Sequence, residues 1–80
     1  MKKPSVTDRV LEVCEWIETG RARSLRESAG LTQREVAQSC EVSQGAVLRW
    51  ERAERRPRGR NALAYHQVLS KLVAREQAAA

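Results

Sequence analysis

The sequence has 80 residues, and its fifteen basic and ten acidic side chains give a net charge of +5. This length allows one small domain without a separate ligand-binding domain. With no Phe, two Trp and one Tyr, the core must come mainly from aliphatic side chains on helices, which favours an all-α fold. No apolar run is long enough to span a membrane, and the widely separated Cys14 and Cys40 favour buried free thiols over a disulfide bridge or a zinc site.

Residues 5–19 are predicted to form the first helix. Apolar side chains recur there at helical spacing, at Val6, Val10, Val13 and Ile17, with Leu11 and Cys14 widening the stripe and Ser5 or Thr7 as the cap. Trp16 is expected opposite this stripe. Residues 1–5 lead into a mixed helix and not into the apolar region of a signal peptide, so we expect a cytoplasmic protein, in a bacterium or a phage-infected host cell.

Two short helices follow. Residues 21–29 repeat the helical period and end at Gly30, with one face formed by Ala22, Leu25, Arg26 and Ala29. Thr32 and Glu35 have the spacing of a capping box, in which each side chain accepts a hydrogen bond from the other's backbone N–H. The third helix should therefore begin at Gln33 and run to about Cys40.

Residues 33–52 have the apolar spacing of two short helices that clasp each other across a tight turn. The residues that form this pattern are Val36, Ala37, Cys40, Val42, Val47 and Trp50. Ser43 is expected to cap the second of these helices, which should end near Ala53. A helix-turn-helix of this kind leaves an outward face that would enter a DNA major groove, formed by Ser43, Gln44, Gly45 and Arg49.

An arginine-rich loop and a last helix complete the chain. Pro57 and Gly59 interrupt the helical pattern, and Asn61 is predicted to cap a helix that runs towards Glu76, before a frayed end. The apolar stripe of this helix is wider than one core contact requires and consists of Leu63, Ala64, Tyr65, Val68, Leu69, Leu72 and Val73. Part of it could pair with a second copy of the chain. The first helix with Trp16 is the competing dimer surface, and burial of either stripe in the monomer core is the third alternative. His66 is expected at the surface.

The stretch GLTQREVAQSCEVSQGAVLRWERAERRPR resembles the Cro/C1-type helix-turn-helix, or XRE, family, which includes small phage repressors and antitoxins. The resemblance covers about residues 21–72. It implies a compact bundle of about five helices of the lambda-repressor type with an extra N-terminal helix at 5–19, a core at 21–73, the helix-turn-helix at 33–52 and a tail at 74–80. It also implies operator binding as a dimer, with the fourth helix as the recognition helix.

Two positions depart from the family pattern. Glu41 stands in the turn where members usually have Gly, so a slightly reshaped turn is expected, since a side chain in a left-handed conformation costs about 1 kcal/mol. Glu51-Arg52-Ala53 replaces the common Glu-Asn-Gly, which suggests a recognition helix that runs further before the loop.

Two side chains are candidates for base contacts. The amide of Gln44 can pair with adenine in a bidentate manner, and the guanidinium of Arg49 can bond guanine O6 and N7. Ser43 and Gly45 share this end of the helix, and Gly45 allows close approach of the backbone. Leu48 could meet a thymine methyl group or belong to the core or an interface. Without the motif, Gln44 and Arg49 would be interpreted as solvated helix surface.

Phosphate contacts are expected from two other places. The first is the start of the helix at 33–40, with Thr32, Gln33 and Arg34; the resemblance implies a phosphate contact at Gln33. The second is the loop after the recognition helix, with Arg52, Arg55, Arg56 and Arg58. Twelve of the fifteen basic residues are Arg, whose planar side chain suits phosphate, so nucleic acid is favoured over a merely soluble basic surface.

Arg26 and Glu51 are charged residues on the inward faces of their helices. Because their charges are opposite, each suggests the other as its partner, and the family resemblance implies the same ion pair. Such a pair would orient the recognition helix. The alternative is that both side chains reach out to solvent.

The sequence as a whole favours a sequence-specific DNA-binding repressor of the phage Cro type. One recognition helix contacts few base pairs, so a homodimer on a pseudo-palindromic double-stranded operator is expected. The alternative is an antitoxin-like module that binds a partner protein and autoregulates. No enzymatic activity, cofactor, metal, small-molecule ligand or membrane contact is expected, since no catalytic set, phosphate loop or metal cluster is present in the sequence.

Overall fold

The computed structural model describes residues 4–79, which contain five helices and no strand. The helices are α1 (Val6–Glu18), α2 (Arg21–Ser28), α3 (Gln33–Cys40), α4 (Gln44–Glu51) and α5 (Gly59–Ala79). The predicted all-α class is confirmed, with the N-terminal helix counted among the five. Residues 1–3, part of the segment inspected for a signal peptide, and residue 80 of the predicted tail lie outside the described residues.

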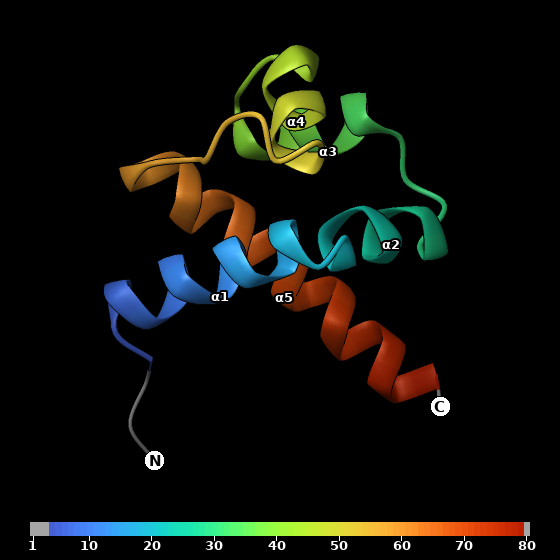
Figure 1. Ribbon diagram of the computed structural model, residues 1–80. Helices are drawn as coiled ribbons and strands as arrows, with labels where there is room; N and C mark the ends of the chain where they lie inside the picture. The colour runs from blue at the N-terminus through green and yellow to red at the C-terminus, as the bar shows by residue number, and fades with distance from the viewer. Residues whose placement is uncertain (1–3, 80) are drawn as a thin grey trace.

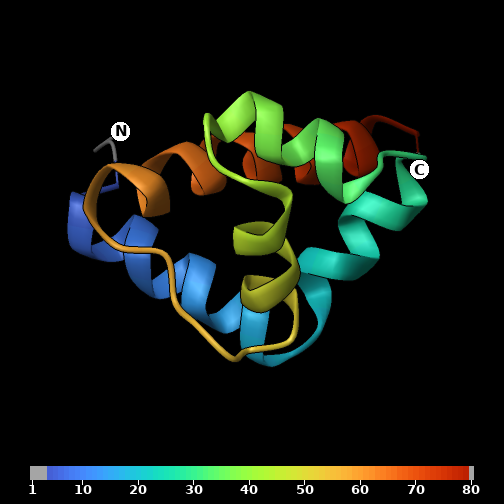
Figure 2. The same cartoon turned by 90° about the horizontal axis from the view of Figure 1, so that it is seen from above.

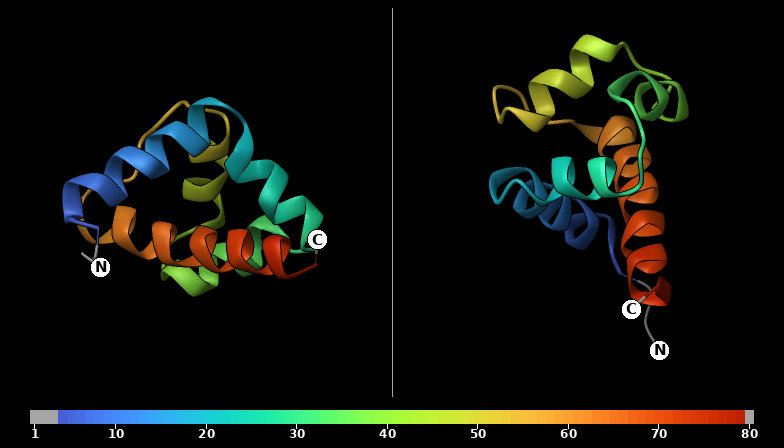
Figure 3. Two further views of the ribbon diagram at one scale, coloured as in Figure 1. Left: turned by 90° about the horizontal axis from the view of Figure 1, so that it is seen from below. Right: turned by 90° about the vertical axis from the view of Figure 1, so that its right-hand side faces the viewer.

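Helix α5 is the support on which the other helices pack. It contacts α1, α2 and α3, while α3 pairs with α4 (Figure 1). Seen from the side, α3 and α4 lie at one end of α5, and α1 and α2 lie beside it (Figure 3). Helix α4 reaches α5 through Trp50, whose ring centroid lies 4.9 Å from that of Tyr65. The helix-turn-helix is thus presented at one end of the molecule.

All five helices contribute to the core. The buried apolar residues are Val13, Ile17, Ala22, Leu25, Val36, Ala37, Cys40, Val47, Trp50, Ala62, Tyr65, Leu69 and Leu72. Five of the six residues that predicted the clasp between α3 and α4 are among them, and Val42 is half-buried against the same core. The apolar stripe of α5 is largely covered as well, since Ala64, Val68 and Val73 pack on this core. The monomer therefore uses most of the surface proposed for a dimer.

Helix α1 differs from the prediction in which side chains it buries. Val6 is 57% exposed and Leu11 62% exposed, because the buried residues of α1 are confined to its second half. Trp16 does not lie opposite the stripe; it is three residues after Val13 and therefore beside it. There it stacks on His66 of α5, with ring centroids 5.4 Å apart.

His66 is not the surface residue that was expected. Its side chain is 12% exposed, and its Nε2 lies 2.6 Å from Oε1 of Glu12 on α1. Together with the stacked Trp16, this contact fastens α1 to α5 along the half of α1 that the core buries.

Helix α5 is longer at both ends than predicted. Asn61 does not cap it, because the N–H groups of Asn61 and Ala62 both donate to the carbonyl of Arg58, at 3.0 and 3.4 Å, so the first turn forms earlier. At the other end the helix continues past Glu76 to Ala79, where a frayed end was expected. An ion pair of 2.7 Å between Glu76 and Arg21 ties this last part to α2.

Helix α4 ends at Glu51, so the prediction of a longer recognition helix is wrong. Ala53 adopts the left-handed conformation, with a φ of +57°, in place of the family's glycine. Its N–H donates to the carbonyl of Trp50 at 3.0 Å, and the next N–H, of Glu54, donates to the carbonyl of Arg49 at 2.9 Å. This is the Schellman pattern that closes many helices.

The turn between α3 and α4 has the same geometry. Glu41 is left-handed, with a φ of +58°, and the N–H of Val42 donates to the carbonyl of Ala37 at 3.0 Å. Glutamate thus takes up the conformation expected of glycine, and the following N–H bonds back onto α3 as in a glycine-closed helix end.

Replacing Ala53 with Gly should stabilise the fold. A left-handed alanine costs about 1–2 kcal/mol more than glycine, and the added freedom of the unfolded chain offsets about 0.4–1 kcal/mol of this cost, so we expect a gain of about 0.5–1 kcal/mol in the free energy of unfolding. Urea titration measures this gain. The matched control, Ala74→Gly in the exposed middle of α5, should lose about 1 kcal/mol, and a loss for both variants would contradict the argument.

Candidate nucleic-acid interface

A buried ion pair fixes α4 against α2. Nε of Arg26 donates to Oε2 of Glu51 at 2.6 Å, and Nη2 donates to Oε1 at 3.0 Å. The side chains are only 12% and 3% exposed, so neither reaches out to solvent. The remaining guanidinium nitrogen, Nη1, donates to the carbonyl of Leu31 at 2.9 Å. The hydrogen bond to Glu51 is the main cause that raises the pKa of Arg26 above its ordinary value.

Gln33 is part of the same network. Its Nε2 donates to Oε1 of Glu51 at 3.0 Å, so α3 is joined to α2 and α4 at this carboxylate. The sequence pattern does not predict this bond, since it joins residues 18 positions apart; the resemblance implies only a phosphate contact at Gln33. One of its two amide N–H groups is engaged here, which leaves the second for another acceptor.

The start of α3 has the predicted capping box. The hydroxyl of Thr32 accepts from the N–H of Glu35 at 3.0 Å, and the N–H of Thr32 donates to Oε1 of Glu35 at 3.0 Å. This backbone hydrogen bond is the main reason that the pKa of Glu35 lies below its ordinary value. Arg34 lies next to the cap and is exposed.

Tyr65 of α5 is fully buried. Its hydroxyl is the one buried side-chain oxygen or nitrogen in residues 4–79 that has no hydrogen-bond partner. Burial, and secondly the charge of Glu51, raise the pKa of Tyr65 well above its ordinary value.

The outward face of α4 carries the side chains that are predicted to contact bases. Gln44 and Arg49 are both exposed, and the hydroxyl of Ser43 caps the helix by accepting from the N–H of Ala46 at 3.1 Å. A Cβ at Gly45 would lie 3.4 Å from Nη1 of Arg49, so the guanidinium folds back along α4 over the glycine. Gly45 therefore leaves room for Arg49 beside Gln44.

The arginines around α4 fall into two groups. Arg56 pairs with Glu18 of α1 at 2.7 Å, and Arg60 pairs with Glu41 at 3.0 Å, both in exposed positions. In the other group no side-chain hydrogen bond or ion pair to another described residue is present; its members are Arg34, Arg49, Arg52, Arg55 and Arg58. Arg56 is thus paired with a carboxylate of α1, whereas the second group has no such partner within residues 4–79.

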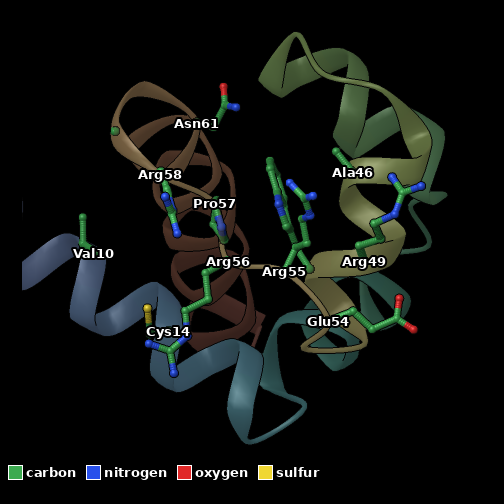
Figure 4. A pocket seen from close by; sticks show the side chains of 12 residues that line it. Val10, Cys14, Ala46, Arg49, Glu54, Arg55, Arg56, Pro57, Arg58 and Asn61 are labelled. Atoms are coloured by element: carbon green, nitrogen blue, oxygen red, sulfur yellow. The ribbon is translucent and has the colours of Figure 1, made fainter.

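A cleft of about 1260 Å³ lies between α4, the loop after it and α1. Seen from above, the loop leaves α4 and returns towards α1 before the chain enters α5 (Figure 2). The close view shows Arg56 reaching down beside Cys14 of α1, with Arg55 between the loop and α4 (Figure 4). The cleft therefore adjoins the face of α4 that carries Arg49.

Comparison with protein families decides what this arrangement is. Residues 23–71, more than half of the chain, match the helix-turn-helix family model. The chain belongs to the Cro/C1-type helix-turn-helix family, also called XRE. It is accordingly a DNA-binding transcription regulator, and the family is a regulatory one and not a known family of enzymes. The searches of curated proteins and of solved structures found no match.

Within residues 4–79, no three His, Cys, Asp or Glu side chains gather as a metal site would require. No helix in the described part of the chain is both long and apolar enough to cross a membrane.

Replacing Glu51 with Ala should destabilise this domain strongly. The variant leaves the guanidinium of Arg26 buried without its carboxylate, for which we expect a loss of about 3 kcal/mol in the free energy of unfolding. Thermal unfolding followed by circular dichroism measures it. Glu76→Ala breaks an exposed pair of similar length and should have a much smaller effect, and equal shifts for the two variants would refute a structural role of the buried pair.

Replacing Tyr65 with Phe should have the opposite effect. The variant removes a buried hydroxyl that has no partner and keeps the ring that packs on Trp50, so we expect a gain of about 1 kcal/mol. Denaturant titration measures it. A loss of stability would instead indicate that the hydroxyl is satisfied by a buried water molecule.

Proposed function

We propose that this protein is a phage-type repressor that binds a pseudo-palindromic operator as a homodimer in the bacterial cytoplasm or a phage-infected cell. Helix α4 enters the major groove, where Gln44 contacts adenine and Arg49 contacts guanine. Ser43 and Gly45, at the N-terminal end of α4, lie against the bases as well. Thr32, Gln33, Arg34 and the arginines of residues 52–58 hold the phosphates on either side. In this proposal the chain is one domain, with an N-terminal helix at 5–19, a DNA-binding core at 21–73 and a tail at 74–80.

The observation that carries the proposal is that α4 is held from within by an ion pair, while exposed donors on it and directly after it have no partner among the described residues. The Arg26–Glu51 pair holds α4 from within, while Gln44 and Arg49 are exposed on its outside. Arg52, Arg55 and Arg58 follow directly and have no carboxylate partner among the described residues. Preorganised donors of this kind need no rearrangement to meet DNA.

Selection of bound sequences from a random DNA pool by the purified chain tests the proposal. We expect enrichment of two inverted half-sites about one helical turn apart. An enriched single half-site would remove the dimer from the proposal, and the absence of any enrichment would contradict sequence-specific binding.

The same selection with Gln44→Ala should lose preference at one base pair of each half-site. Loss of a bidentate contact to adenine is worth about 1–3 kcal/mol of discrimination. Gln38→Ala, an exposed glutamine of α3 with no assigned contact, is the control and should return the parental sequence. An unchanged selected sequence for Gln44→Ala would exclude Gln44 from base contact.

Replacing Arg52, Arg55 and Arg58 with Ala should weaken binding to all sequences and flatten its salt dependence. Each lost phosphate contact reduces the slope of log K against log salt by about 0.9. Fluorescence anisotropy at several salt concentrations measures the slope. Arg75→Ala at the far end of α5 is the control, and equal slopes for both proteins would exclude the loop from phosphate binding.

A second candidate function is an antitoxin-like module that binds a partner protein. The exposure of Val6 and Leu11 favours it, because both lie on α1, outside the residues that match the family model. Stoichiometric copurification of an unrelated chain that is lost in Leu11→Ser would support this function, whereas tight operator binding by the pure chain supports the repressor.

A further inference from the structure

We propose that the cleft between α1, α4 and the loop after α4 binds one nucleotide unit, with its phosphate on arginines and its sugar or base against α1. The proposal rests on the proposed function in one respect, because the DNA strand beside the half-site is one source of such a unit. A free nucleotide is the other source. Helix α1, which lies outside the family match, thereby becomes part of the binding surface.

The charged side of the cleft suits a phosphate. Arg55 and Arg58 line the cleft, and neither has a carboxylate partner among the described residues. Arg56 also lines the cleft, although it is paired with Glu18. Glu54 is the only carboxylate in the lining. The guanidinium groups of Arg55 and Arg58 can attract an anion and can bond its oxygens in pairs.

Apolar side chains line the cleft as well, which a phosphate alone would not require. Val10 and Cys14 of α1 lie on one side of this space, and Pro57 of the loop and Ala46 of α4 lie on the other (Figure 4). The buried Trp50 also belongs to the lining. A ligand that joins an anionic group to an apolar part would suit the arginines and the apolar side chains at the same time. A nucleotide unit is such a ligand, since it combines a phosphate with a sugar and a flat base. The volume, about 1260 Å³, is ample for one such unit.

Cys14 supplies a built-in reporter for the occupied cleft. It lines the cleft and is half-buried, whereas Cys40 is buried in the core, and burial raises the pKa of the Cys40 thiol to about 11. A neutral thiol reagent such as N-ethylmaleimide should therefore label Cys14 first, because the protonated Cys40 is a poor nucleophile. Cys14→Ser should remove the fast phase.

The experiment follows this fast phase in the intact chain in three arms: alone, with a random-sequence DNA duplex, and with a mixture of deoxynucleoside 5′-monophosphates. Binding of the duplex is recorded in parallel by gel shift. An occupant that covers Cys14 should slow labelling about tenfold at a concentration about ten times its Kd, because only the free protein reacts.

Each outcome decides between explanations. Slower labelling with the duplex alone identifies the DNA strand as the source, and slower labelling with the mononucleotides identifies a free nucleotide; both support the site. Unchanged labelling while the gel shift shows bound duplex overturns the cleft and leaves the proposed function standing. Unchanged labelling in all arms with no gel shift overturns the cleft and shows that the chain lacks general affinity for duplex DNA, whereas sequence-specific binding is judged by the selection experiment.

A negative charge introduced among the apolar side chains of the cleft gives an independent test. Val10→Glu places a carboxylate in the cleft and should weaken duplex binding about tenfold by repelling the phosphate. Ser24→Glu on the exposed face of α2 adds the same charge outside the cleft and should change binding less than about twofold. Equal effects of the two variants would contradict the site, and Cys14 labelling remains decisive if Val10→Glu unfolds α1.

Discussion

The carboxylate of Glu51 is the point on which the arrangement of the helix-turn-helix depends. It is almost fully buried and accepts two hydrogen bonds from Arg26 and one from Gln33, so that α2, α3 and α4 meet at one charge. Burying such a charge is costly unless its oxygens are paired, and here both oxygens are bonded. Because a carboxylate with fixed partners accepts only a narrow range of geometries, the network restricts how α4 can rotate and shift relative to the core. A recognition helix held in this way presents its outer face in one orientation.

The same network limits what Gln33 can do for DNA. With one amide N–H on Glu51, only the other can donate to a phosphate, and that phosphate would then be connected through Gln33 to the buried carboxylate. The position of α4 and the contact at the start of α3 would thus be coupled. This coupling distinguishes Gln33 from Arg34, which is exposed and carries its charge without any internal bond.

Sequence patterns predicted the features that depend on neighbours a few residues apart. The capping box of Thr32 and Glu35 and the apolar clasp of α3 and α4 follow from helical spacing. The Arg26–Glu51 contact followed from two inward charges of opposite sign. The stacking of Trp16 on His66 and the ion pair of Arg21 with Glu76 were missed, since they depend on how α5 crosses α1 and α2, which no local spacing encodes. The end of α4 was mispredicted because alanine rarely adopts the left-handed conformation that Ala53 has.

The acidic residues decide which arginines remain open to a ligand. Glu18 binds Arg56 of the loop and Glu41 binds Arg60 at the start of α5, so the positive charge of these two arginines is partly neutralised within the molecule. Four arginines of α4 and the loop directly after it have no such partner among residues 4–79, namely Arg49, Arg52, Arg55 and Arg58. The arginines that contribute to the net charge of +5 are therefore not all equally open to a ligand. The unpaired arginines of α4 and the loop therefore leave unbalanced positive charge next to the recognition helix, where it would attract an incoming phosphate.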